Sequence, residues 1–152
     1  MRRPSKPLFR NSPVAYFSLF SIAFASATLL PGGSEAFFLY LLTQKNSPIL
    51  LLCIVTVGNT LGSYTNYLLG KYMLWLAQKR DYMNQRWIDK ANALFGKYGF
   101  WTLWFSWMPV IGDPLTLVAG IARYSQIKFF LIVFCAKLLR YGIVYASFLA
   151  IV

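Results

Sequence analysis

The sequence predicts an all-α integral membrane protein built from two related halves. Composition predicts the class, because 58% of the residues are hydrophobic and 12% are charged, against roughly 45–50% and about 25% in soluble domains. A repeated motif predicts the halves: a proline followed four residues later by an acid occurs at 31–35 and again at 109–113. With 152 residues, the chain is expected to form a single membrane domain, residues 1–152.

Apolar stretches mark the expected helices. A straight helix needs about 20 apolar residues to cross the hydrocarbon core of a bilayer. Only the third and the last stretch are long enough to span it unaided. The stretches cover residues 14–30, 36–42, 49–69, 100–111, 115–122 and 129–152.

Proline and glycine interrupt the shorter stretches. Proline removes a backbone donor and clashes with the preceding turn, and glycine relaxes the helix further. Each half, 14–70 and 99–152, is therefore expected to hold a broken segment, either crossing or re-entrant, followed by a transmembrane helix. The predicted structural breaks are Pro31, Gly32 and Gly33 in the first half and Pro109, Gly112 and Pro114 in the second.

Residues 71–98 connect the halves and are polar and basic. Their apolar residues recur at helical spacing, which is typical of an amphipathic helix on the membrane surface. A solvated connector with a few packed aromatic residues explains the pattern equally well. The residues that set the spacing are Trp87, Ala91, Leu94, Phe95 and Tyr98, with Lys90, Asn92 and Lys97 between them.

The net charge is +11, and lysine and arginine gather in residues 2–10 and 71–97. Basic residues flanking apolar stretches indicate cytoplasmic segments rather than a nucleic-acid surface, so no nucleic-acid partner is expected. Placing both segments in the cytoplasm requires an even number of crossings between them. A re-entrant first segment would instead place one of them outside.

Glu35 and Asp113 are the candidate proton-coupling residues. Each stands just after a break, at the start of a short apolar stretch. An acid inside a membrane is costly and therefore points to function, and a carboxylate that alternates between charged and neutral is the usual proton-coupling device. The alternative is that each acid only caps a helix N-terminus, where the free N–H groups favour it.

Lys137, Arg140 and Asn59 are the candidate substrate-binding residues. Lys137 and Arg140 are three residues apart and so share one face of a helix. Their expected partners are Glu35, Asp113 or an anionic headgroup, and the planar fork of arginine suits phosphate. Asn59 aligns with Lys137 when the halves are superposed with an offset of 78 residues. The alternative is a static set of buried ion pairs.

Several segments together resemble the DedA family of the SNARE-associated, or VTT-domain, superfamily. They are Gly-Asn-Thr-Leu-Gly-Ser-Tyr-Thr-Asn-Tyr-Leu-Leu-Gly at 58–70, the spacing of Pro31 and Glu35, and 109–120 with its closing Ala-Gly. Residues 98–120, with Ser-Trp-Met-Pro-Val-Ile-Gly-Asp, look most like the small YqaA subfamily. The resemblance extends from about Ser18 to Tyr145.

The resemblance implies a multi-pass protein of the bacterial inner membrane with two re-entrant segments that face each other. The family includes transporters driven by the proton-motive force and proteins implicated in flipping undecaprenyl phosphate. Its essential acid matches Glu35, and its later arginine matches Arg140. The chain departs from the family at Asn59, where a second acid is usual, and at 112–113, where an arginine is usual.

The expected function is that of a proton-coupled transporter or flippase of an anionic lipid, either a phospholipid or a polyprenyl phosphate. The alternative is a non-transport protein of membrane integrity or assembly with a static charge network. A third class, a membrane enzyme acting on lipid phosphates, is disfavoured because the chain has no histidine and no clustered metal ligands. No catalytic residue, metal or cofactor is predicted, and a homodimer is expected because one short chain makes a small core.

Overall fold

The computed structural model describes residues 11–28, 33–80, 84–109 and 111–151. These ranges are entirely helical apart from turns and short connections, with no strand, which confirms the all-α class. The elements are α1 (Pro13–Thr28), α2 (Gly33–Thr43), α3 (Pro48–Arg80), α4 (Gln85–Trp104), the 3-10 turn η1 (Phe105–Trp107), α5 (Gly112–Ile121) and α6 (Gln126–Ile151).

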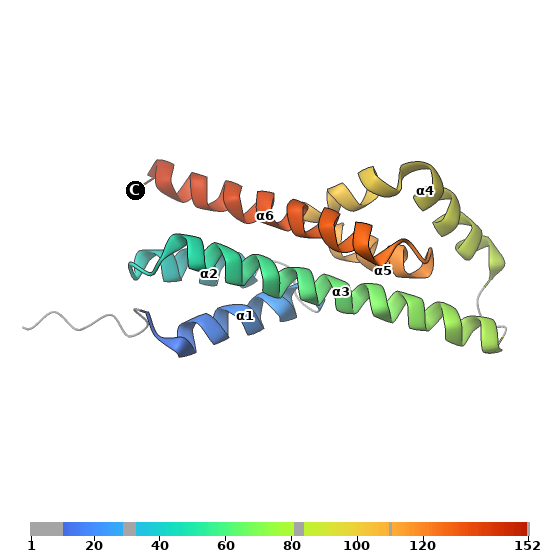
Figure 1. The fold of residues 1–152 in the computed structure, drawn as a ribbon, viewed down its shortest axis with the longest axis horizontal. Helices are drawn as coiled ribbons and strands as arrows, with labels where there is room; N and C mark the ends of the chain where they lie inside the picture. Colours follow the sequence, from blue (N-terminus) through green and yellow to red (C-terminus); the bar gives the residue numbers. More distant parts are fainter. Residues whose placement is uncertain (1–10, 29–32, 81–83, 110, 152) are drawn as a thin grey trace, which may run out of the picture.

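Helix α3 runs along the whole bundle. Helices α1 and α2 lie beside its N-terminal half and α5 lies beside its C-terminal half, while α6 runs antiparallel to it (Figure 1). Helix α4 packs on α5 and α6. Within the described ranges, Pro48–Leu76 is the one helix that is both long and apolar enough to cross a membrane, and α1 is apolar but shorter. Helix α6 has 26 residues, with Lys137 and Arg140 near mid-length.

Two short helices, α2 and α5, precede the two long ones. They have 11 and 10 residues, so each is roughly 15 Å long, about half the thickness of the hydrocarbon core. Of the predicted breaks, Pro31 and Gly32 lie outside the described residues. Gly33 begins α2.

The three predicted residues of the second break all lie within the described ranges. Pro109 follows η1, Gly112 begins α5, and Pro114 lies in the first turn of α5. Proline is tolerated there because the N–H groups of a first turn have no partner within the helix. The three predicted break residues therefore all fall between η1 and the first turn of α5.

Glycine allows α3 to approach both α1 and α5 closely. A Cβ at Gly62 would collide with the carbonyl of Phe24 in α1. On the α5 side the contact is reciprocal: a Cβ at Gly70 would meet the carbonyl of Leu117, and one at Gly120 would meet the carbonyl of Tyr67. The α3–α5 contact is thus one of backbone against backbone.

The segment 71–98 is divided between two helices. Helix α3 continues to Arg80, and α4 begins at Gln85 after Asn84, whose side chain accepts a hydrogen bond from the N–H of Arg86 (3.1 Å). Helix α4 is kinked at Tyr98. The predicted apolar face is only partly correct, because Ala91 and Phe95 are buried whereas Trp87, Leu94 and Tyr98 remain exposed. The buried face is shifted toward Ile88 and Gly99 because α4 packs against α5.

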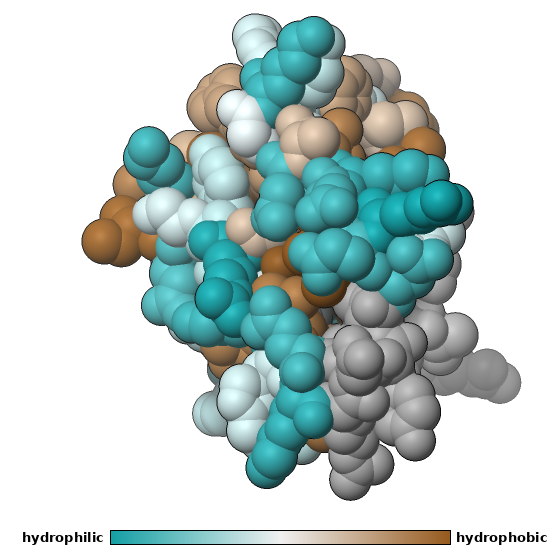
Figure 2. Space-filling view, turned by 90° about the vertical axis from the view of Figure 1, so that its right-hand side faces the viewer, coloured by the Kyte–Doolittle hydropathy of each residue, from teal (hydrophilic) through white to brown (hydrophobic). Residues whose placement is uncertain are grey.

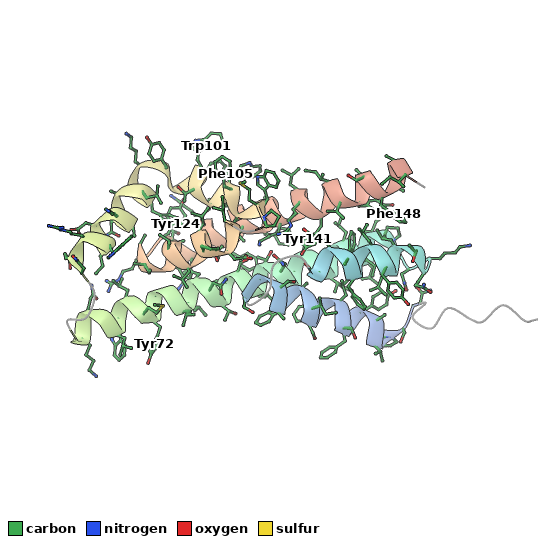
Figure 3. All side chains as sticks on the ribbon, turned by 180° about the vertical axis from the view of Figure 1, so that it is seen from behind. Tyr72, Trp101, Phe105, Tyr124, Tyr141 and Phe148 are labelled. Carbon is green, nitrogen blue, oxygen red and sulfur yellow. The ribbon has the colours of Figure 1, made fainter. Side chains whose placement is uncertain are left out.

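One end of the bundle is polar and basic. Figure 2 looks onto the end where α3 finishes and α4 begins, and hydrophilic side chains gather over it. Arg123, after α5, donates to Gln78 of α3 there (2.9 Å). Elsewhere aromatic side chains point outward, as Tyr72, Trp101 and Phe105 do in Figure 3. Exposed aromatic residues of this kind suit a lipid-facing surface.

Candidate functional site

Helix α6 buries both of its central basic residues. Lys137 has no exposed side-chain surface and Arg140 is 7% exposed. They lie three positions apart, so one face of α6 presents both charges to the bundle interior. Buried charges are stable only when they are paired and hydrogen-bonded.

Each base is paired with one of the two predicted acids. Lys137 Nζ donates to Asp113 Oδ1 at 3.0 Å. Arg140 Nε donates to Glu35 Oε1 at 2.6 Å, and its Nη2 contacts the same oxygen. The structure thus joins four residues whose partners the sequence left open. One face of α6 is linked to α5 through the first pair and to α2 through the second.

Both acids lie in the first turn of a short helix. Glu35 is in the first turn of α2, and Asp113 is in that of α5. The predicted position at the start of a short helix is therefore confirmed for both acids, and each acid also has a buried cation as partner, which a cap does not require. Beside Glu35, the hydroxyl of Ser34 is hydrogen-bonded to that of Tyr141 (2.8 Å), which is a second link between α2 and α6.

Asn59 has a different partner from those of the charged residues. Its amide nitrogen donates to the carbonyl of Ala23 in α1 (3.1 Å), and Asn66 makes the same kind of bond to Ala27 (2.7 Å). The carbonyl oxygen of Asn59 is buried without a protein partner. The amide nitrogen of Asn59 therefore links α3 to α1, and its amide oxygen remains able to accept a hydrogen bond from another group.

Sequence reasoning missed a row of buried polar residues on α3. Thr56, Asn59, Thr60 and Ser63 are each 2% exposed or less, and each has a side-chain oxygen without a protein partner. Their spacing of three and four residues places them on one helix face. We call these four residues the polar row. Of the four, only Asn59 was singled out from the sequence, although the spacing of all four is visible there.

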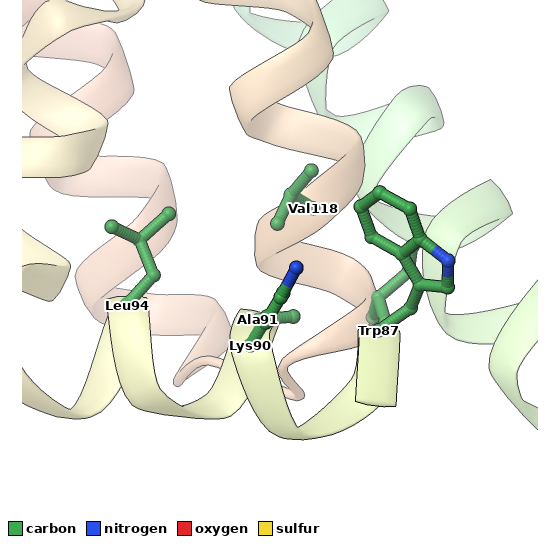
Figure 4. Close-up of a pocket in the computed structure, with 6 residues that line it drawn as sticks. Trp87, Lys90, Ala91, Leu94 and Val118 are labelled. Atoms are coloured by element: carbon green, nitrogen blue, oxygen red, sulfur yellow. The ribbon is translucent and has the colours of Figure 1, made fainter. Parts of the chain in front are cut away.

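A separate cavity lies between α4 and α5. It has a volume of about 380 Å³. Its walls are apolar except for Lys90, whose ammonium lies 5.1 Å from the centre of the Trp87 ring. None of its lining residues belongs to the two ion pairs, and none is an acid. The lining residues are Trp87, Lys90, Ala91, Leu94, Val118 and Ile121 (Figure 4).

Comparison with known proteins finds a matching domain family and similar inner membrane proteins. Residues 30–149 match the VTT domain. The chain is 41% identical to the inner membrane protein YqaA of Escherichia coli over 140 residues. These aligned residues make up 90% of this chain and 93% of that protein. The YqaA of Shigella flexneri matches with the same identity and coverage.

An uncharacterized protein of Haemophilus influenzae is 40% identical over 131 residues, which is 81% of this chain and 80% of that protein. No solved structure matches. The VTT domain match spans most of the chain, including Glu35, Asp113, Lys137 and Arg140. The chain therefore belongs to the DedA family of VTT-domain proteins.

Proposed function

We propose that this protein is a multi-pass inner-membrane transporter that moves an anionic lipid, with movement coupled to protonation of Glu35 or Asp113. One observation carries the proposal: two ion pairs join a single face of α6 to the first turns of two short helices. We infer that α2 and α5 are re-entrant, because each is too short to cross the bilayer alone. The pairs would then lie at membrane depth.

Counter-ion exchange gives the proposed chemistry. A protonated Glu35 no longer neutralises Arg140, and an unpaired buried charge typically costs about 3–5 kcal/mol. A lipid phosphate that takes the place of the carboxylate removes this cost, and the guanidinium can bind it through two parallel hydrogen bonds. Loss of the proton restores the ion pair and displaces the phosphate. Lys137 and Asp113 can exchange partners in the same way.

The exposure of the four side chains suits this order of events. The acids are partly exposed, Glu35 at 26% and Asp113 at 18%, whereas the bases are almost fully buried. A proton can therefore reach a carboxylate before a phosphate reaches its cation. The polar, basic end of the bundle would face the cytoplasm, where basic residues are retained and anionic headgroups attract them.

A static network is the second candidate, and one observation favours it. The two acids and two bases already balance each other in two complete pairs. A protein of membrane integrity or assembly would need no more than that. In that case the pairs never open, and neither lipid nor proton exchanges with them.

A reconstituted translocation assay separates the two candidates. Purified protein in liposomes is tested with labelled anionic and neutral lipids, with and without a pH gradient. Transport predicts faster movement of anionic lipid that responds to the gradient, and Glu35→Gln or Asp113→Asn should remove that response because an amide cannot ionise. Equal rates for protein-free and protein-containing liposomes, under both conditions, would overturn the transport proposal.

A further inference from the structure

The polar row is unusual because its buried hydroxyl groups have no hydrogen-bond partner in the protein. Serine and threonine inside a helix commonly donate to the carbonyl four residues earlier. Thr65 and Ser26 do so here, at 3.1 and 2.7 Å. Thr56, Thr60 and Ser63 are fully buried and have no protein partner. Buried polar groups are nearly always hydrogen-bonded to protein or to ordered water.

The antiparallel packing of α3 and α6 places the polar row beside the buried charges. The rings of Tyr67 and Phe129 are 4.7 Å apart. Twelve residues earlier in α3, Val55 shares a core cluster with Tyr141, which is twelve residues later in α6. Residues 56–63 therefore lie at the level of residues 133–140. This stretch of α6 contains Lys137 and Arg140.

At this level Lys137 has hydrogen-bond donors that are not used, whereas the polar row has acceptors that are not used. A lysine ammonium has three donors, and within the described ranges Asp113 is the acceptor that Lys137 Nζ meets. The unpartnered oxygen of Asn59 falls at the same level of the bundle as Lys137. A fifth unpartnered oxygen, a hydroxyl, belongs to Ser106, whose backbone lies against Gly112, the residue before Asp113.

We propose that the polar row binds a chain of water molecules that connects Asn59 and the hydroxyls of α3 to the Lys137–Asp113 pair. Water fits because it can donate to the unpaired oxygens and accept from the ammonium. A metal cation does not fit, since the row offers only neutral oxygens next to a buried positive charge. The side chains of Tyr67 and Phe129 close the row at its Ser63 end.

The role of these water molecules in proton transfer rests on the proposed function. An excess proton that enters the row of water molecules is passed from each water to the next, and the last water donates it to a carboxylate oxygen of Asp113. Only hydrogen bonds and O–H bonds are exchanged. The neutral acid then releases Lys137. Binding of water itself does not depend on whether lipid is transported, so the two proposals can fail separately.

Cysteine accessibility tests the water chain directly. Cys53 and Cys135 are exposed and are first replaced by alanine. Thr60→Cys and Ser63→Cys are then treated in membrane vesicles with a small methanethiosulfonate reagent, which reacts with the thiolate and so needs water. The matched control is Val55→Cys, because Val55 lies on the same helix, has no exposed surface and belongs to an apolar cluster. We expect both row cysteines to react at least about tenfold faster than the control. Equal, slow labelling of all three would overturn the proposal.

A substitution that removes one hydroxyl gives a second measurement. Thr60→Val keeps the shape of the side chain. In a dry row the unpaired hydroxyl is a cost, so its removal raises Tm. In a row that binds water the hydroxyl is satisfied, so Tm stays the same or falls by a few degrees. Labelled row cysteines in a protein that moves no lipid would support the water chain and reject the transport proposal.

Discussion

The two short helices hold their acids in different ways. Helix α5 is fixed to α3 by reciprocal backbone contacts at Gly70 and Gly120, and its Asp113 faces the fully buried Lys137. Helix α2 is held to α6 by side chains: Ser34 bonds to Tyr141, and the ring of Phe38 packs against that of Tyr141 at 5.9 Å. The core around α2 is made of side chains as well.

The difference suggests which half moves. Side-chain contacts can be exchanged by rotation about a few bonds, whereas a backbone contact without a Cβ between the helices cannot be remade after a small shift. We therefore expect α5 to keep its place in the bundle, and α2 with Glu35 to act as the part that rearranges, together with the side chain of Arg140. The partly exposed Glu35 is also the more accessible acid.

The largest expected effect comes from breaking the α3–α5 contact. A Cβ at Gly120 would collide with the carbonyl of Tyr67, and backbone atoms cannot move aside, so Gly120→Ala should cost at least about 3 kcal/mol. The readout is the yield and Tm of purified protein in detergent. Gly142→Ala is the control, because no other described helix comes within 4 Å of its Cβ position. Equal Tm values for the two variants would show that α5 is not fixed in this way.

The second prediction compares the two bases. Lys137→Gln leaves Asp113 unpaired and should cost about 3–5 kcal/mol. Arg140→Gln should cost less, because Glu35 is more exposed than Asp113 and can be hydrated. Thermal unfolding in detergent measures both, and Lys137→Gln combined with Asp113→Asn should recover most of the loss. A larger loss for Arg140→Gln would reverse the assignment of fixed and moving parts.

A third prediction concerns function rather than stability. Arg140→Lys keeps the charge but loses the planar fork, so anionic lipid movement should fall on the order of tenfold while Tm barely changes. The control is Lys137→Arg, which should affect stability more than lipid movement because Lys137 is fully enclosed. Unchanged transport in Arg140→Lys would mean that Arg140 supplies only a charge.

The smallest expected effect concerns the Ser34–Tyr141 link. Tyr141→Phe leaves the buried hydroxyl of Ser34 unpaired, which should cost about 1–2 kcal/mol. Tyr145→Phe is the control, with an expected change within about 0.5 kcal/mol. Thermal unfolding distinguishes them. If the Tyr141 variant keeps its stability but gains transport rate, the link restrains the movement of α2.

Local features of the fold followed from the sequence. The apolar stretches predicted α1, α2, α3, α5 and α6, because helix formation in a membrane depends on nearby residues and on the absence of water. The second break fell among Pro109, Gly112 and Pro114, and Lys137 and Arg140 share one face, as their spacing required. The segment 71–98 was harder to predict. Its polarity indicated a connector, but its first ten residues continue α3 as far as Arg80.

The tertiary structure decided which groups meet. Arg140 pairs with Glu35 across 105 residues, and Lys137 pairs with Asp113 across 24. No local pattern distinguishes this pairing from the opposite one, because it depends on how α2 and α5 pack on α6. The same holds for the polar row: spacing places Thr56, Thr60 and Ser63 on one face, but only the antiparallel packing of α3 against α6 buries that face at the level of the two bases.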